Sequence, residues 1–234
     1  MIRVDPGPTT AAPGPLDHGR APRSSLSGAT RRRLRRASWA LMSVAVVLVG
    51  YVGLLIAYEG YQQHRLSSDW DRAHPAGSIV DRTQAPGADL TSQRPHLADG
   101  QPLARLRLSS VGFDAIVTEG SESGILSSGP GHEDHTAYPG EGGLVLFSNH
   151  NGFSLSWGDL RVGDAVVVEM SYGRYRYTIT DRSIVSGGDS SILHRSHNGD
   201  VLYLSTCWPL WQGALARDRL VFQAVPAAAA GAKA

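Results

Sequence analysis

The sequence predicts an all-β domain, a closed or nearly closed β-barrel with short helices and loops, preceded by one N-terminal transmembrane helix. Between residues 102 and 226, short β-branched and aromatic runs alternate with clusters of Gly, Asn, Asp and Ser. Many short strands joined by such turns are typical of a barrel. Upstream, residues 37–58 contain no charged side chain. The chain has 234 residues, enough for one sizeable domain with appendages.

The N-terminal part of the sequence predicts a membrane anchor and its orientation. Residues 1–36 are rich in Arg, Pro, Gly and Ser and end in an arginine cluster, which indicates a disordered basic cytoplasmic segment. Residues 37–58 are long enough to cross a bilayer as a helix. The positive-inside tendency then leaves the C-terminal bulk outside the cell, anchored by a single pass.

Two other interpretations of this segment are weaker. A cleaved signal peptide would be shorter and would be followed by a small-x-small cleavage site, which is not seen after residue 58. Nucleic-acid binding by the arginine cluster is also disfavoured, because a hydrophobic helix follows it directly and the net charge is only +1. We therefore expect no nucleic-acid partner.

The remaining segments are a linker, the barrel and a tail. Residues 59–101 are expected to form an extracytoplasmic linker. A helix can continue over residues 62–72, and Pro75, Pro86 and Pro95 disfavour regular structure after it. Residues 102–226 form the predicted barrel, and residues 227–234 an Ala-rich flexible tail. The strand-like runs of the barrel are 103–108, 113–117, 144–147, 165–169, 175–179, 184–185, 201–206 and 220–225.

The chain contains one cysteine, Cys207, which ends a strand-like run. A lone cysteine is more often a small buried apolar residue than a nucleophile. Here, however, His150 follows the end of another run and Arg219 opens a third. A thiol needs a base to become a nucleophile, and the oxyanion formed by its attack needs a positive charge. Neighbouring barrel strands can bring these three side chains together.

Histidine spacing also admits a metal hypothesis, which we disfavour. His132 and His135, and again His194 and His197, have the H-x-x-H spacing that zinc ligands use. Both pairs lie in polar, loop-like stretches, and the carboxylates form no cluster suited to calcium. We expect neither a metal nor another cofactor.

Residues 103–225 resemble the sortases, the membrane-anchored cysteine transpeptidases of Gram-positive bacteria. Leu204-Ser205-Thr206-Cys207 is similar to the family's T-L-x-T-C strand end, and Ser148-Asn149-His150-Asn151 stands in the place of A-G-H-x. The other matching stretches are 129–132 with 139–143, 158–160 with 162–164, and Arg219-Leu220-Val221-Phe222.

The pattern departs from the family at three places. Tyr203 stands where Thr is frequent, Ser148-Asn149 replaces Ala-Gly, and bulky Trp208 follows the cysteine. The Cys-Trp-Pro ending and the single membrane helix most resemble class E sortases, with class D next.

The resemblance implies roles for individual residues. Cys207 would be the nucleophile, His150 the general acid and base, and Arg219 the group that stabilises the oxyanion. Arg217 is the nearby competitor for that last role. Thr206 and Trp208 would contribute to substrate binding.

It also implies a reaction and partners. A secreted protein with a C-terminal LAxTG- or LPxTG-type sorting signal would be cut between Thr and Gly, held as a thioester, and transferred to a cell-wall amine. Two alternatives remain open at this stage: a thiol hydrolase of the same fold, and a non-catalytic, membrane-tethered binding barrel.

Overall fold

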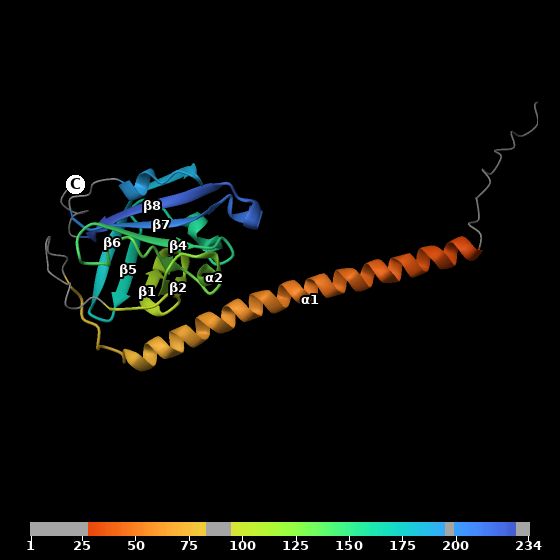
Figure 1. The fold of residues 1–234 in the computed structure, drawn as a ribbon, viewed down its shortest axis with the longest axis horizontal. Helices are drawn as coiled ribbons and strands as arrows, with labels where there is room; N and C mark the ends of the chain where they lie inside the picture. The colour runs from red at the N-terminus through yellow and green to blue at the C-terminus, as the bar shows by residue number, and fades with distance from the viewer. Residues whose placement is uncertain (1–27, 83–94, 195–198, 228–234) are drawn as a thin grey trace, which may run out of the picture. The chain divides into compact units, whose positions relative to one another are not determined.

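The computed structural model describes residues 28–82, 95–194 and 199–227. One long helix, α1 (Gly28–Ala73), precedes a domain of strands joined by short helical turns (Figure 1). The strands are β1 (Pro102–Leu108), β2 (Phe113–Glu119), β3 (Gly131–His132), β4 (Leu144–Asn149), β5 (Ala165–Met170), β6 (Gly173–Ser186), β7 (Val201–Trp208) and β8 (Asp218–Pro226). The turns are η2 (Ser109–Val111), α2 (Ser123–Leu126), η3 (Leu155–Asp159), η4 (Ser191–His194) and η5 (Leu210–Leu215).

The strands close into a barrel in the order β1-β2-β3-β4-β7-β8-β6-β5, and β5 pairs back with β1. The predicted all-β barrel is therefore confirmed. The β2–β3 and β4–β7 pairs are parallel, and the other pairs are antiparallel. Because parallel neighbours end at the same edge of a sheet, the residues that follow β4 and those at the end of β7 lie at one edge of the barrel.

Alternation along the strands separates a core face from an outer face. Phe147 on β4, Leu204 on β7 and Phe222 on β8 are buried in one large cluster inside the barrel. Their sequence neighbours Leu146, Tyr203 and Val221 belong to a second cluster on the opposite face. Successive side chains of a strand point to opposite faces, so residues two positions apart share a side.

One strand is longer than the sequence suggested. The runs 175–179 and 184–185, expected as separate strands, both lie on β6, which spans Gly173–Ser186. Its register against β8 shifts between Ile179 and Asp181. A bulge of this kind admits an extra residue and bends the strand without ending it, which explains why the polar residues between the two runs do not form a turn.

Helix α1 begins at Gly28, inside the segment expected to be disordered as far as residue 36. That expectation is wrong for residues 28–36. Arginine is a good helix former, and no Gly or Pro interrupts residues 29–49; residues 1–27 lie outside the described part. The helix contains an 18-residue window with a mean hydropathy of 2.5, long and apolar enough to cross a membrane. The chain divides into two compact units after Tyr51.

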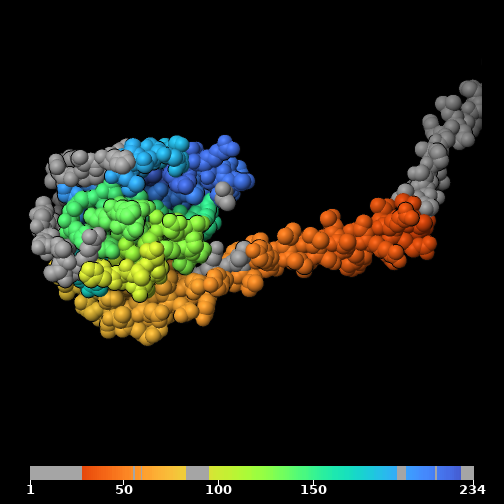
Figure 2. Space-filling model, in the orientation of Figure 1, coloured from red at the N-terminus to blue at the C-terminus, as the bar shows by residue number. Residues whose placement is uncertain are grey.

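Within the second unit, the end of α1 is part of the folded domain. Trp70 and Ile79 are buried against Ile116 of β2, with Leu66 packed beside them. The Gln63 side chain accepts a hydrogen bond from the Ile116 N–H (3.0 Å) and donates to its carbonyl (3.1 Å). Figure 2 shows the golden surface of this helix end lying against the yellow-green surface of β1 and β2.

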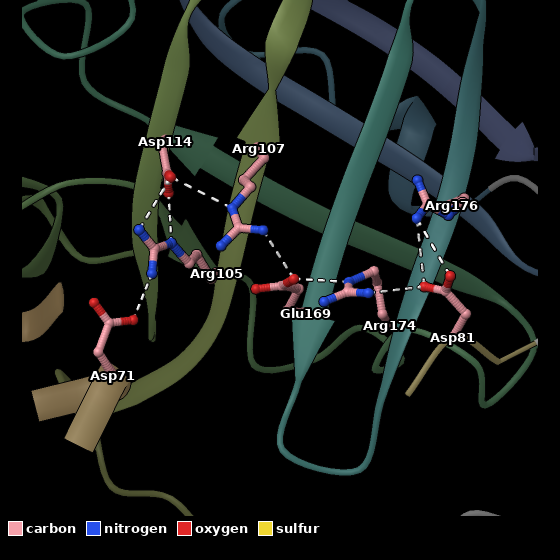
Figure 3. Close-up of polar contacts among 8 residues, drawn as sticks. All are labelled: Asp71, Asp81, Arg105, Arg107, Asp114, Glu169, Arg174 and Arg176. Carbon is pink, nitrogen blue, oxygen red and sulfur yellow. Dashed lines mark hydrogen bonds and ion pairs between the residues drawn. The ribbon is translucent and has the colours of Figure 1, made fainter. Parts of the chain in front are cut away.

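An ion-pair network adds to this attachment (Figure 3). Buried Glu169 of β5 accepts hydrogen bonds from Arg107 (2.9 Å) and Arg174 (2.7 Å). At either end the network reaches acidic residues outside the barrel strands, because Arg105 contacts Asp71 of α1 (2.6 Å) and Arg174 contacts Asp81 (3.2 Å). The full network is Asp71, Asp81, Arg105, Arg107, Asp114, Glu169, Arg174 and Arg176.

Candidate active site

Strand register places the three predicted catalytic residues in one row. The last pair of the parallel β4–β7 ladder is Asn149 with Thr206. His150 and Cys207 are the next residues after this pair in the sequence. In the antiparallel β7–β8 ladder, Cys207 lies directly opposite Arg219. Directly opposed residues have Cβ atoms about 5 Å apart. The register therefore places Cys207 beside Arg219, with His150 just past the end of the neighbouring strand, although the three residues come from distant parts of the sequence.

These residues lie on the outer side of the barrel wall. Cys207 and Arg219 alternate with Thr206 and Leu220, which are both buried. The outer position leaves Cys207 partly exposed, as a nucleophile requires.

A cavity of about 290 Å³ contains the row. Its lining comes from the ends of β4, β7 and β8 and from the connection between β2 and β3, which includes α2. Hydroxyl groups are frequent around it, and they can hydrogen-bond to a peptide. The lining residues are Ser121, Ser123, Leu126, Ser148, Asn149, His150, Ser205, Thr206, Cys207 and Arg219.

A tight turn fixes the backbone of His150. Its carbonyl oxygen accepts hydrogen bonds from the N–H groups of Phe153 (3.0 Å) and Ser154 (3.1 Å), and from the Ser154 hydroxyl (3.0 Å). The same hydroxyl contacts that of Thr206, the residue before Cys207. Ser154 therefore connects the turn that carries His150 to β7.

Of the two residues predicted to bind substrate, the structure brings one to the cavity. Thr206 lines it, although its buried hydroxyl is engaged by Ser154. Trp208 is absent from this lining: it packs against the barrel core, with the guanidinium of Arg182 5.9 Å from its ring. Successive side chains of a strand point to opposite faces. Cys207 faces outward, so Trp208, the next residue, faces the barrel core.

The geometry distinguishes the two candidate arginines. Arg219 lines the cavity that contains Cys207, whereas Arg217 lines a separate cavity beside Trp208 and η5. The carbonyl of Arg217 accepts a hydrogen bond from the N–H of Gly187 (2.9 Å). A Cβ on Gly187 would lie 2.3 Å from that carbonyl oxygen and 3.3 Å from Nη1 of Arg219. The absence of a side chain there lets β8 approach.

His132, half of one H-x-x-H pair, has a different environment from a metal ligand. It is fully buried, with Nδ1 3.2 Å from Oε1 of Glu119 and Nε2 3.2 Å from the carbonyl of Ala137. Its partner in that spacing, His135, is exposed. Within the described ranges, no group of three or more His, Cys, Asp or Glu side chains is arranged to hold a metal ion. His197 lies outside them.

Sequence reasoning missed several residues around the row. Asn151 and Ser154, which hold His150, carry no signal beyond closeness to the histidine in the sequence. Ser121 and Ser123 sit in a polar connection that looks like any loop. Their place in the cavity wall depends on β3 pairing between β2 and β4, and β3 is too short to be recognised in the sequence.

Comparisons with known proteins agree with this geometry. A family model described as "Sortase domain" matches residues 106–227, more than half of the chain. Sortase D of Bacillus subtilis is 32% identical over 111 residues, which cover 47% of this chain. The matched region spans only 56% of the length of that relative.

Two solved structures share the fold. The Sortase D5 transpeptidase of Clostridium perfringens aligns with a TM-score of 0.51 at 22% identity, covering 58% of this chain and 84% of its own. Sortase C-1 of Actinomyces oris aligns with a TM-score of 0.50 at 22% identity, covering 73% of this chain and 99% of its own.

Proposed function

This chain belongs to the sortase family, and we propose that it is a cysteine transpeptidase that cleaves a C-terminal sorting signal and transfers the protein to an amine. The observation that carries the proposal is the row of His150, Cys207 and Arg219 on neighbouring strands around one cavity. A buried, inert thiol would not need a histidine and an arginine beside it. A non-catalytic binding barrel is disfavoured for the same reason.

The reaction divides into two acyl transfers. His150 takes the proton of the Cys207 thiol, and the thiolate attacks the carbonyl carbon of the signal's Thr while Arg219 stabilises the oxyanion. The Thr–Gly C–N bond then breaks, His150 gives a proton to the leaving amine, and a thioester remains. An incoming amine attacks this thioester, its proton passes to His150, and Cys207 leaves as the thiolate. Atoms and charge balance without a cofactor.

The substrate is proposed from the family resemblance and from the cavity. An extended peptide presents backbone N–H and C=O groups, and Ser148 and Ser205, whose hydroxyls can hydrogen-bond to such groups, line the cavity. Ser148 is one of the departures from the family pattern, and it lines the cavity. We propose a signal of the LAxTG type in preference to LPxTG, in keeping with the class E resemblance.

The test compares kcat/KM for peptides that differ only in Ala or Pro at the second signal position. A pocket discriminates by roughly 1–3 kcal/mol per misfit methylene, so a preference of at least tenfold for Ala is expected. A clear preference for Pro would reject the class E assignment and leave the transpeptidase proposal standing. The full chain in detergent is the appropriate sample, because α1 contributes Gln63 and Trp70 to the domain.

We further propose that α1 anchors the enzyme, with the arginine cluster in the cytoplasm and the barrel outside. The secreted partners and the cell-wall amine acceptor would then meet the cavity on the outer side of the membrane. A periplasm- or exterior-dependent reporter fused after Ala234 should be active. Activity of a cytoplasm-dependent reporter at the same position would contradict this orientation.

The hydrolase alternative is tested in the same reaction. With signal peptide and an amine such as triglycine, the proposal expects a ligated product that requires Cys207. If the peptide were cleaved but only water accepted the acyl group at saturating amine, hydrolysis would be the function. If a Cys207→Ala variant cleaved the peptide equally well, the site would be wrong.

A further inference from the structure

The ring of His150 contacts the side-chain amide of its neighbour Asn151. Oδ1 of Asn151 lies 3.2 Å from Nδ1 of His150. Nδ2 of Asn151 donates a hydrogen bond to the carbonyl of Leu210, at the start of η5, with an N···O distance of 3.2 Å. The Asn151 side chain is only 3% exposed, so water does not easily substitute for either contact.

The donors and acceptors fix where the proton lies. A backbone carbonyl can only accept, so the group of Asn151 that faces Leu210 must be its NH₂. The group left facing His150 is the amide oxygen, which carries no hydrogen. Nδ1 of His150 must therefore carry a proton for this contact to be a hydrogen bond. In the neutral imidazole this leaves Nε2 unprotonated.

Only an unprotonated ring nitrogen can accept the proton of a thiol. The turn with Phe153 and Ser154 fixes the backbone of His150, and the contact with Asn151 selects the tautomer of its ring. The amide oxygen is neutral, so it accepts the Nδ1 proton in both the neutral and the charged ring. The same hydrogen bond therefore persists throughout a cycle of proton transfers at Nε2.

We propose that Asn151 is a positioning residue that holds His150 in the Nδ1–H tautomer and ties it to the β7–β8 connection through Leu210. The inference rests on the proposed function for its effect on turnover, but the tautomer itself does not depend on it. Removing the amide should leave binding intact and slow the steps in which His150 moves a proton. The expected loss in kcat is about tenfold, or about 1.4 kcal/mol, with KM unchanged.

The direct readout is the ¹⁵N NMR spectrum of the histidine-labelled full chain in detergent at alkaline pH, where the ring is neutral. A His150→Gln variant identifies the signal of this ring among the nine histidines. The wild-type spectrum should show Nδ1 as the protonated nitrogen. A wild-type ring protonated on Nε2 would overturn the proposal without any further variant.

An Asn151→Leu variant tests the cause. It should shift His150 toward the Nε2–H form and lower kcat about tenfold, whereas Asn151→Asp should keep the Nδ1 proton but lose the donor to Leu210. Gln212→Leu, the same kind of amide-to-leucine exchange but within η5 itself, should change neither readout. An unaltered tautomer in the Asn151→Leu variant would overturn the proposal. If the wild type proved inactive as a transpeptidase, only the proposed function would fall.

Discussion

Replacing Gln63 by Ala should destabilise the catalytic domain, although this residue lies on the helix before the barrel. The side chain accepts from the N–H of Ile116 (3.0 Å) and donates to the carbonyls of Ile116 (3.1 Å) and Ser128 (2.6 Å). Ile116 is fully buried. The Gln63→Ala variant therefore leaves backbone groups of β2 without their partner.

The magnitude follows from these contacts. A hydrogen bond contributes about 0.5–1.5 kcal/mol net, so three of them contribute about 1.5–4.5 kcal/mol. Gln63 is half-buried, and water can replace part of this, so we expect a loss of about 2 kcal/mol. For a domain of this size, that corresponds to a decrease in Tm of about 4–8 °C.

The assay is thermal unfolding of the full chain in detergent, followed by near-ultraviolet circular dichroism. Gln62→Ala is the matched control, because it makes the same exchange one residue earlier in the same helix, where the side chain donates a hydrogen bond to the Tyr58 hydroxyl (2.8 Å) and not to a barrel strand. Its Tm should change by less than about 1 °C, as is usual for surface substitutions. Equal Tm values for the two variants would refute the view that α1 is part of the folded domain.

Three further outcomes are expected. Arg219→Ala should lower kcat/KM by about a hundredfold or more, whereas Arg217→Ala should lower it less than threefold, in a peptide ligation assay; the reverse ranking would show that the wrong arginine was chosen. Gly187→Ala should lower the same rate because its Cβ would lie 2.3 Å from the Arg217 carbonyl oxygen, whereas Gly188→Ala meets no atom within 4 Å; equal rates would contradict the packing argument. Partial desolvation raises the pKa of Asp81, but hydrogen bonds from two arginines outweigh it and lower that pKa overall. Ionised Asp81 therefore stabilises the folded state above the ordinary pKa of 3.8, and this stabilisation is lost as the pH falls through the lowered pKa. An Asp81→Asn variant should have a lower Tm than the wild type at pH 6, and the difference in Tm should disappear in acid.

The barrel was predictable because its strands carry strong local signals. The run 144–147 became part of β4, and the run 201–206 became part of β7, since β-branched and aromatic residues with flanking turns favour strands. β3 was not predictable, because two residues, Gly131 and His132, carry no periodicity. Its existence depends on pairing with β2 and β4, which is a tertiary effect.

The site was predictable to a different extent. Chemistry and family order selected Cys207, His150 and Arg219, and the register of β4, β7 and β8 supports that selection by bringing them to one cavity. Their roles stay predictions until they are measured. Asn151 was part of a matching stretch but was given no role, because an amide beside a histidine is common and only the contact with Leu210 shows which way it points.

The contribution of α1 to the domain was also missed. Residues 59–101 resemble a linker because they are polar and contain prolines. The signal was present in the spacing of Leu66 and Trp70, which lie one helical turn apart and face β2. Two apolar residues are too few to distinguish a packed helix end from an exposed one without knowledge of the opposing surface.

The central claim is that Cys207 forms a thioester with the Thr of a sorting signal, and intact-mass spectrometry of the full chain tests it most directly. After brief incubation with an LAxTG peptide and no amine, the wild type should gain the mass of the peptide acid that ends at Thr, less one water. Fragmentation should place that mass on Cys207, and hydroxylamine should remove it. A wild-type chain that turns over peptide without this adduct, or an adduct that persists in Cys207→Ala, would contradict the account.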